Sequence, residues 1–253
     1  MSTTSTQTDR GAGKDEPSVR ELVERATHAY IAQLQPRYFN DDPAAVAELA
    51  RLRRGAGRRA HEVQDLWGIG ALENLAESLA KKSKKPSDAR RENAEEAVFL
   101  ASTLWALHQQ SRRDHRTHTR GKDLGGAVRA LIRLKESART DEEESTLRKR
   151  LVRVGTAESL QSVAVRLREI VMLLRAQSEP LSLDYARLAG QLYRWQDRNA
   201  RAGVQREWGR EFHLAAGPRA KKGKTTDAEK GETIDPTLSA DEDGTYGGHS
   251  AGE

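Results

Sequence analysis

The segment LQSVAVRLREIVMLL, residues 160–174, decides the fold. Its large apolar residues recur every three or four positions, which places them along one face of an α-helix. This stripe, the most regular in the chain, consists of Leu160, Val163, Leu167, Ile170, Val171 and Leu174. A helix with one apolar face needs other helices to cover that face, so the segment predicts a helical bundle.

Helix signals continue on both sides of this segment. Capping residues or proline mark expected helix starts at Ser18 with Glu21, Asp42 with Pro43, Asp123, Thr140 with Glu143, and Ser182. Apolar spacing predicts further helices over about 71–80 and 88–110, a last helix through 204–212, and a polar loop over 111–123. We therefore expect an all-α chain of two small helical bundles, 18–139 and 140–215, with disordered tails over 1–17 and 216–253.

Composition supports helices and excludes several classes of protein. The chain is 36% hydrophobic and 32% charged, which suits helices with one buried stripe each and does not suit a doubly covered sheet. There is no cysteine, so disulfides and thiolate metal sites are excluded. The polar residues 1–17 resemble neither a signal peptide nor an anchor, and the longest aliphatic run, Ile170–Leu174, is far below the roughly 20 residues that cross a bilayer. We expect a cytoplasmic protein that does not associate with membranes.

The net charge of +5 understates how basic the folded part is. Residues 225–253 contain eight acidic residues and a single base, Lys230. Without this acidic tail, 42 bases stand against 30 acids, a net charge of +12. A basic body of this size favours a polyanionic partner, because each base placed near a phosphate releases condensed counterions.

Catalytic motifs are missing from the sequence. The glycines at 55–57 and 68–70 lack the context of a dinucleotide-binding loop and indicate helix ends. His115 and His118 have a spacing that could serve a metal-dependent nuclease, but five bases in the same loop would repel a divalent cation. We therefore expect no enzyme activity, no metal and no cofactor, and keep a nuclease built on His115 and His118 as a weaker alternative.

The four tryptophans could stack on bases or pack in the core. Trp105, Trp195 and Trp208 lie on apolar stripes, which favours the core, whereas Trp67 lies beside Gly68 between helices.

Arginine and lysine are concentrated in three patches. The first patch has no acid within it and follows the end of a helix; it consists of Arg51, Arg53, Arg54, Arg58 and Arg59. The second patch is an expected mobile loop and the helix after it: Arg112, Arg113, Arg116, Arg120, Lys122, Arg129 and Arg133. The third patch consists of Lys149, Arg150 and Arg153. We also expect Gly125 and Gly126 to let a phosphate approach backbone N–H groups. Together the patches indicate sequence-independent nucleic-acid binding.

Several short motifs in a fixed order resemble the CasB family, the small subunit of the type I-E CRISPR Cascade complex. They are ELARLRRG at 48–55, DLGG at 123–126, LRKRLVR at 147–153 with RLR at 166–168, LDY at 183–185 before Trp195, and EWGREF at 207–212. Order and spacing match over about residues 43–214. Arg53 and Arg54 fall in the first motif, and Arg150 and Arg168 in the paired helices. The family can carry a base where this chain has Gly126, so Arg129 is the candidate for that role.

The resemblance implies a non-catalytic, all-α subunit of an antiviral surveillance complex. Its expected partners are the backbone subunits that coat the guide RNA, the large subunit, a second copy of itself, and the target and non-target DNA strands of an R-loop. The alternative that the residues leave open is a helical assembly protein whose basic patches dock on acidic protein surfaces.

Overall fold

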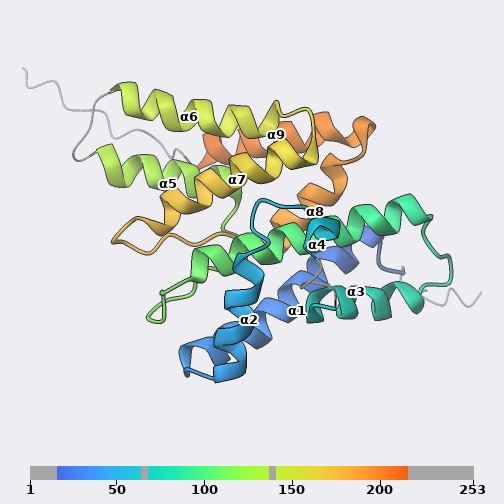
Figure 1. Cartoon of the computed structure of the whole chain (residues 1–253). Helices are drawn as coiled ribbons and strands as arrows, with labels where there is room; N and C mark the ends of the chain where they lie inside the picture. The colour runs from blue at the N-terminus through green and yellow to red at the C-terminus, as the bar shows by residue number, and fades with distance from the viewer. Residues whose placement is uncertain (1–15, 64–67, 137–140, 216–253) are drawn as a thin grey trace, which may run out of the picture. The chain divides into compact units, whose positions relative to one another are not determined.

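The computed structural model describes residues 16–63, 68–136 and 141–215, and these ranges are mainly helical (Figure 1). The only β-type pairing within them is an isolated bridge between His118 and Leu183. The α-helices are α1 (Val19–Phe39), α2 (Pro43–Arg53), α3 (Gly70–Ala80), α4 (Asp88–Gln109), α5 (Leu124–Glu136), α6 (Asp141–Gly155), α7 (Leu160–Arg175), α8 (Tyr185–Trp195) and α9 (Arg198–Leu214), with a short 3-10 turn at Ala60–Glu62. The all-α class is confirmed.

The predicted helix starts are largely confirmed by capping bonds. The N–H of Ser18 donates to Glu21 Oε2 at 2.7 Å and the N–H of Glu21 donates to Ser18 Oγ at 3.3 Å, which completes the capping box of α1. Asp42 Oδ1 accepts from the N–H of Ala44 at 2.9 Å at the start of α2.

One expected helix start is wrong, and another cannot be judged. Asp184, not Ser182, caps α8: its Oδ1 accepts from the N–H of Arg187 at 3.0 Å. Leu183 is instead held in a bridge with His118, and its N–H donates to the carbonyl oxygen of Thr117 at 2.9 Å, so the helix begins only after it. Thr140 lies outside the described residues.

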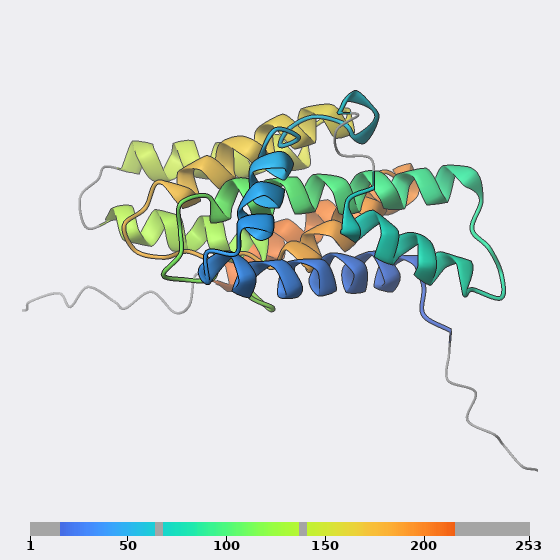
Figure 2. The same ribbon diagram turned by 60° about the horizontal axis from the view of Figure 1, so that its bottom comes forward.

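Helix α4 is the centre of the fold and lies between α1 and α7 in both views (Figures 1 and 2). It packs against α1, α2, α3, α7 and α8, and every residue from Glu96 to Gln109 is buried. Because helices cover α4 on all sides, polar residues such as Thr103 and His108 are buried as well.

The helices fall into two groups that share one hydrophobic core. Helix α5 packs with α6, α7 and α9, whereas α8 packs on α1 and α4 and also contacts α9. The grouping in space therefore interleaves the two halves of the sequence. The predicted boundary after residue 139 falls in residues that the structure does not describe, so it stays a prediction.

Three tryptophans are core residues, as predicted. Trp105, Trp195 and Trp208 are at most 2% exposed, so they cannot stack on a nucleic-acid base. Trp67 lies outside the described residues. None of the described helices is both long and apolar enough to cross a membrane.

Candidate nucleic-acid interface

The turn that follows α2 docks on α7. Gly57 has a φ of +85°, and a Cβ added there would lie 3.0 Å from Cδ of Arg168 on α7. The side chain of Gln161 donates from Nε2 to the carbonyl oxygen of Gly57 at 3.1 Å. This contact between residues more than a hundred positions apart places the first basic patch beside Arg168, a residue that the sequence assigned to a different motif.

Groups within the protein bind part of the first patch. Arg51 pairs with Glu48 at 2.7 Å, and Arg59 pairs at 3.4 Å with Glu96, a buried residue of α4. The guanidinium of Arg58 donates to the carbonyl oxygen of Glu62 at 3.0 Å. Although the stretch itself contains no acid, the fold therefore supplies acids from outside it.

Arg53 and Arg54 differ in their exposure and in their partners within the protein. Arg54 is exposed and already interacts within the protein. Arg53 is half-buried, and among the described residues it meets no carboxylate. Of this patch, Arg53 is the base that the fold leaves available to a phosphate.

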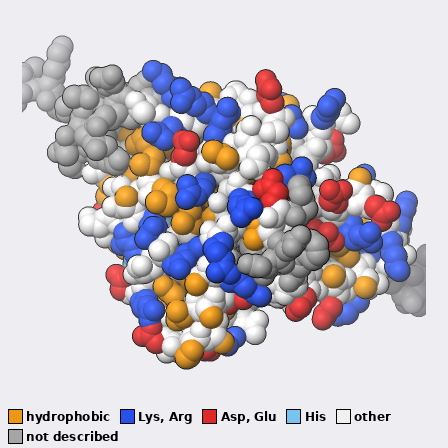
Figure 3. Space-filling view, viewed as in Figure 1, with side chains coloured by type: hydrophobic (Ala, Val, Ile, Leu, Met, Phe, Trp, Pro, Cys, Tyr) orange, Lys and Arg blue, Asp and Glu red, His pale blue; other side chains and the backbone are white. Residues whose placement is uncertain are grey.

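The third patch continues the same surface across α6 and α7. Arg150 pairs with Glu169 of α7 at 3.1 Å, and the guanidinium of Arg166 donates to the carbonyl oxygen of Arg153. Lys149 and Arg153 are exposed, and neither side chain pairs with a carboxylate in the described part of the chain. Figure 3 shows Lys and Arg side chains gathered over α6, α7 and the end of α2. We call the bases of this face whose side chains form no ion pair and no hydrogen bond among the described residues the α7 surface: Arg53, Lys149, Arg153 and Arg168.

The loop 111–123 is anchored, which corrects the expectation that it is mobile. Gln109 Nε2 donates to the carbonyl oxygens of Arg112 and His115. The guanidinium of Arg112 donates to the carbonyl oxygens of Arg175 and Gln177 at the end of α7. These bonds occupy Nη2 of Arg112 within the protein.

Other bases of the second patch divide into bound and exposed ones. Arg113 pairs with Asp41 and lies over the ring of Tyr38, with its guanidinium carbon 5.0 Å from the centroid. Arg116 and Arg120 are exposed at the surface of the loop.

Gly125 and Gly126 do not form the expected phosphate site. A Cβ at Gly125 would collide with the α9 backbone, including the carbonyl oxygen of Trp208 at 2.5 Å, so this glycine is required for α5 to approach α9. The N–H of Gly126 donates to Asp123 Oδ1 at 2.7 Å. The N–H of Gly126 is thus taken by Asp123, and the N–H of Gly125 faces Glu211 Oε2 at 3.5 Å, so neither N–H is free to bind a phosphate.

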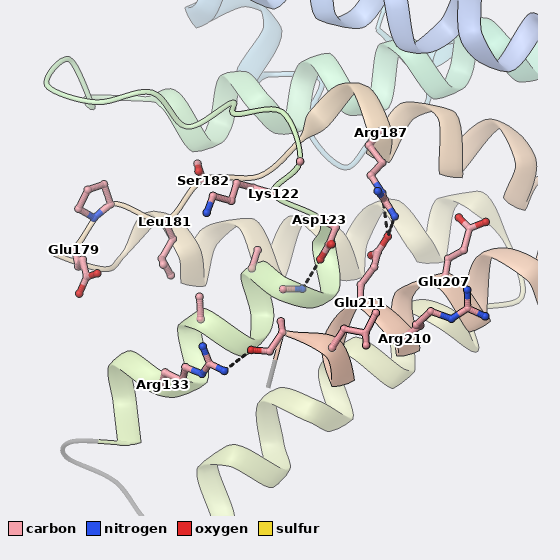
Figure 4. A pocket seen from close by; sticks show the side chains of 17 residues that line it. Lys122, Asp123, Arg133, Glu179, Leu181, Ser182, Arg187, Glu207, Arg210 and Glu211 are labelled. Atoms are coloured by element: carbon pink, nitrogen blue, oxygen red, sulfur yellow. Dashed lines mark hydrogen bonds and ion pairs between the residues drawn. The ribbon is translucent and has the colours of Figure 1, made fainter. Parts of the chain in front are cut away.

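The remaining bases of the second patch lie on α5 and near the end of α9. The guanidinium of Arg129 lies 5.8 Å from the ring centroid of Phe212. Lys122 and Arg133 line a cavity of about 590 Å³, where Arg133 donates to the carbonyl oxygen of Ala215 (Figure 4). The sequence grouped these residues with the loop, but the fold places them together with α9.

His118 forms hydrogen bonds in the interior, whereas His115 forms an exposed contact with its neighbour Asp114. The N–H of Tyr185 donates to His118 Nδ1 at 3.2 Å, so His118 carries its proton on Nε2 and donates to His28 Nδ1 at 3.0 Å. His115 instead contacts Asp114 at 2.9 Å. No group of three or more potential metal ligands occurs among the described residues. His115 and His118 thus have different partners and share no cluster of potential metal ligands among the described residues.

We expect the protein to lose stability as the pH falls from about 6.5 towards 4. Burial lowers the pKa of His118 to about 4, with Asp184 partly opposing the shift, and burial lowers the pKa of His108 to about 3. In this window the unfolded chain binds protons that the folded chain excludes, so unfolding is favoured as the pH falls. Thermal melts at pH 7 and 5 test this. His118→Gln, which keeps a donor and an acceptor but does not titrate, should show a smaller difference in Tm between the two; an equal difference would contradict the role of His118.

Comparisons of the sequence and of the structure with known proteins find the same family. The sequence model of the family described as CRISPR-associated protein Cse2 matches residues 48–213. The crystal structure of CasB from Thermobifida fusca aligns with a TM-score of 0.61 and 41% sequence identity, covering 77% of this chain and 97% of that one. The crystal structure of M. ruber CasB aligns with a TM-score of 0.51 and 21% identity, covering 77% and 94%, and supports the fold alone. No curated protein sequence matches the chain.

Proposed function

This chain belongs to the CRISPR-associated Cse2 (CasB) family, and we propose that it holds DNA strands by their phosphates as the small subunit of a type I-E Cascade complex. In this role it acts in the cytoplasm as a structural subunit without catalytic activity. It assembles with a second copy of itself, the large subunit and the subunits that coat the guide RNA. Holding the target and displaced strands stabilises the R-loop and so serves antiviral defence.

The observation that carries this proposal is the docking of the turn after α2 on α7. The contact of Gly57 with Arg168 joins bases from α2, α6 and α7 into the α7 surface. Since Arg53, Lys149, Arg153 and Arg168 meet no carboxylate among the described residues, their charge is available to a polyanion.

A surface that grips phosphates without reading bases fits the energetics of guided recognition. Exchanging DNA–DNA pairs for RNA–DNA pairs is nearly balanced in free energy, and the guide supplies the sequence specificity. Several phosphate contacts are then sufficient to shift the balance towards the open R-loop, since each contact releases condensed counterions.

We expect the isolated protein to bind DNA weakly, with little sequence preference and a steep dependence on salt. Replacing Arg168 with glutamine should lower the log–log salt slope on single-stranded DNA by about 0.7, the value for one lost phosphate contact. Arg90→Gln, an exposed base at the start of α4, is the matched control and should leave the slope unchanged. Fluorescence anisotropy over a salt series measures both slopes. Equal slopes for the two variants would remove Arg168 from the interface.

Membership of the complex is tested separately from DNA binding. We expect the full chain to co-purify with a guide-RNA complex when the other subunits are co-expressed. Co-purification without any DNA binding by the isolated chain would support a subunit that only assembles with proteins.

One observation favours that second candidate function. Val165 and Met172 lie seven positions apart on α7, on either side of Arg168, and are 46% and 37% exposed. Exposed apolar side chains among bases are typical of protein interfaces. If the α7 surface faces a protein subunit, charge reversal there should abolish assembly and leave the DNA affinity of the isolated chain unchanged.

A further inference from the structure

Gln161, at the start of α7, makes a hydrogen bond to the turn after α2 and leaves its own carbonyl oxygen unpaired. Its Nε2 donates to the carbonyl oxygen of Gly57 at 3.1 Å, whereas its Oε1 is buried and accepts no hydrogen bond from any described residue. A buried acceptor without a donor lowers the stability of a fold. The presence of this amide therefore needs another explanation, and its contact with Gly57 supplies one.

The same glycine meets α7 at a second place. Gln161 and Arg168 lie seven positions apart and so on one face of α7. A Cβ added at Gly57 would lie 3.0 Å from Cδ and 3.8 Å from Cβ of Arg168, so the stem of this arginine runs across the glycine. Figure 2 shows the chain after α2 beside α7. The turn thus docks on α7 and also supports the side chain of Arg168.

The turn is linked directly to Arg53, the last residue of α2. The N–H of Ala56 donates to the carbonyl oxygen of Arg53 at 3.2 Å, which joins the end of the helix to the turn. Beyond the turn, the N–H of Ala60 donates to Glu96 Oε2 on α4 at 3.3 Å. The segment that follows Arg53 is therefore held on α4 by Glu96 and on α7 by Gln161.

We propose that Gln161 is a positioning residue for DNA binding: it holds the turn on α7 and so keeps Arg53 and Arg168 at a fixed separation, where both contact phosphates of one strand. This inference rests on the proposed function. Bases held in place bind a strand together, because the first contact raises the effective concentration of the strand at the second. Gln161 itself touches no phosphate. Without its bond to Gly57, Arg53 moves with the turn and its contact with the strand is lost.

Gln161→Leu removes the donor and keeps a side chain of similar size. Although no charge is removed, we expect affinity for single-stranded DNA to fall about fivefold at 0.1 M salt and the log–log salt slope to fall by about 0.7, the values for one phosphate contact. Gln196→Leu is the matched control: this half-buried amide also donates from Nε2 to a backbone carbonyl oxygen, that of Asn93 at 2.7 Å, but lies at the end of α8. It should leave affinity and slope unchanged in fluorescence anisotropy.

A double-mutant cycle separates positioning from a general loss of structure. In an Arg53→Gln background, Gln161→Leu should have no further effect on affinity, because the contact that it positions is already missing. Two independent losses would instead multiply to about 25-fold.

Hydrogen exchange measures the turn itself, with no DNA present. The amides of residues 55–58 should exchange faster in Gln161→Leu than in the parent and at the parent rate in Gln196→Leu. Gly57→Ala displaces the turn by a different route, through the stem of Arg168, and should give the same faster exchange and at least the same loss of affinity.

These measurements contradict the proposal in three ways. Multiplying effects of Arg53→Gln and Gln161→Leu would overturn it, and so would faster exchange with unchanged affinity. Unchanged exchange in both Gln161→Leu and Gly57→Ala would show that the turn does not depend on this contact, with the same result. Failure of the proposed function is recognised separately: Arg53→Gln and Arg168→Gln would both leave the salt slope unchanged, and the role of Gln161 in DNA binding would be excluded with it even if the turn exchanged faster.

Discussion

Reversing three charges on the α7 surface is expected to lower DNA affinity about 100-fold at 0.1 M salt. The variant is Arg53→Glu with Arg153→Glu and Arg168→Glu, three bases that meet no carboxylate among the described residues. Each lost phosphate contact removes about 0.7 from the log–log salt slope on single strands, or about fivefold in affinity at this salt, and three contacts multiply. Repulsion by the new glutamates adds to the loss. Anisotropy with a labelled oligonucleotide measures the change.

The control has the same change in net charge at another place. Arg25→Glu, Arg90→Glu and Arg198→Glu replace three exposed bases on α1, α4 and the start of α9. We expect this variant to lose much less affinity, since general repulsion is screened beyond about 10 Å at this salt. If both triple variants weaken binding equally, total charge rather than the α7 surface governs binding, and the assignment of the site is wrong.

Gly125→Ala is expected to destabilise the fold by about 2 kcal/mol, which is typical of overpacking in a closely packed interface. The added methyl group would overlap the N–H of Phe212 and lie 2.5 Å from the carbonyl oxygen of Trp208. Both are backbone atoms of α9, so no change of side-chain rotamer can relieve the contact. Helices α5 and α9 must separate, which exposes part of the core around Trp208. For a chain of this size, Tm should fall by about 4–8 °C.

Gly209→Ala is the matched control on α9 itself. A Cβ at Gly209 meets no atom within 4 Å, so alanine is accommodated without strain. Alanine in a helix is favoured over glycine by about 0.5–1 kcal/mol, so this variant should be slightly more stable than the parent. A Gly125→Ala melt that matches Gly209→Ala would show that the α5–α9 contact is not as close as the structure has it.

The helices could be predicted because their signals are local. The capping box at Ser18 and Glu21, Asp42 before Pro43 and the apolar stripe of residues 160–174 each act within a few turns of one helix. The predicted helix start at Ser182 was wrong because of a contact with residues far away in the sequence. Residue 182 does not begin α8, because the neighbouring Leu183 is held by residues of the 111–123 loop.

The basic patches could be located in the sequence, but the sequence did not show which of their bases bind other groups of the protein. Nothing near Arg59 or Arg112 indicated that Glu96 and the end of α7 would take up their guanidinium groups. Nor did the sequence show that Gly125 serves packing against α9, a contact with residues more than eighty positions away.

The sequence by itself determined that this protein is helical, rich in arginine, free of cysteine and similar to the CasB family, because periodicity, capping, composition and motif order are properties of neighbouring residues. The tertiary structure alone decided which bases remain available to a partner. Whether a guanidinium is free depends on carboxylates and carbonyl oxygens brought beside it by the packing of other helices. The tertiary structure also placed Gly57 beside Arg168. This contact makes one surface from bases that are far apart along the chain.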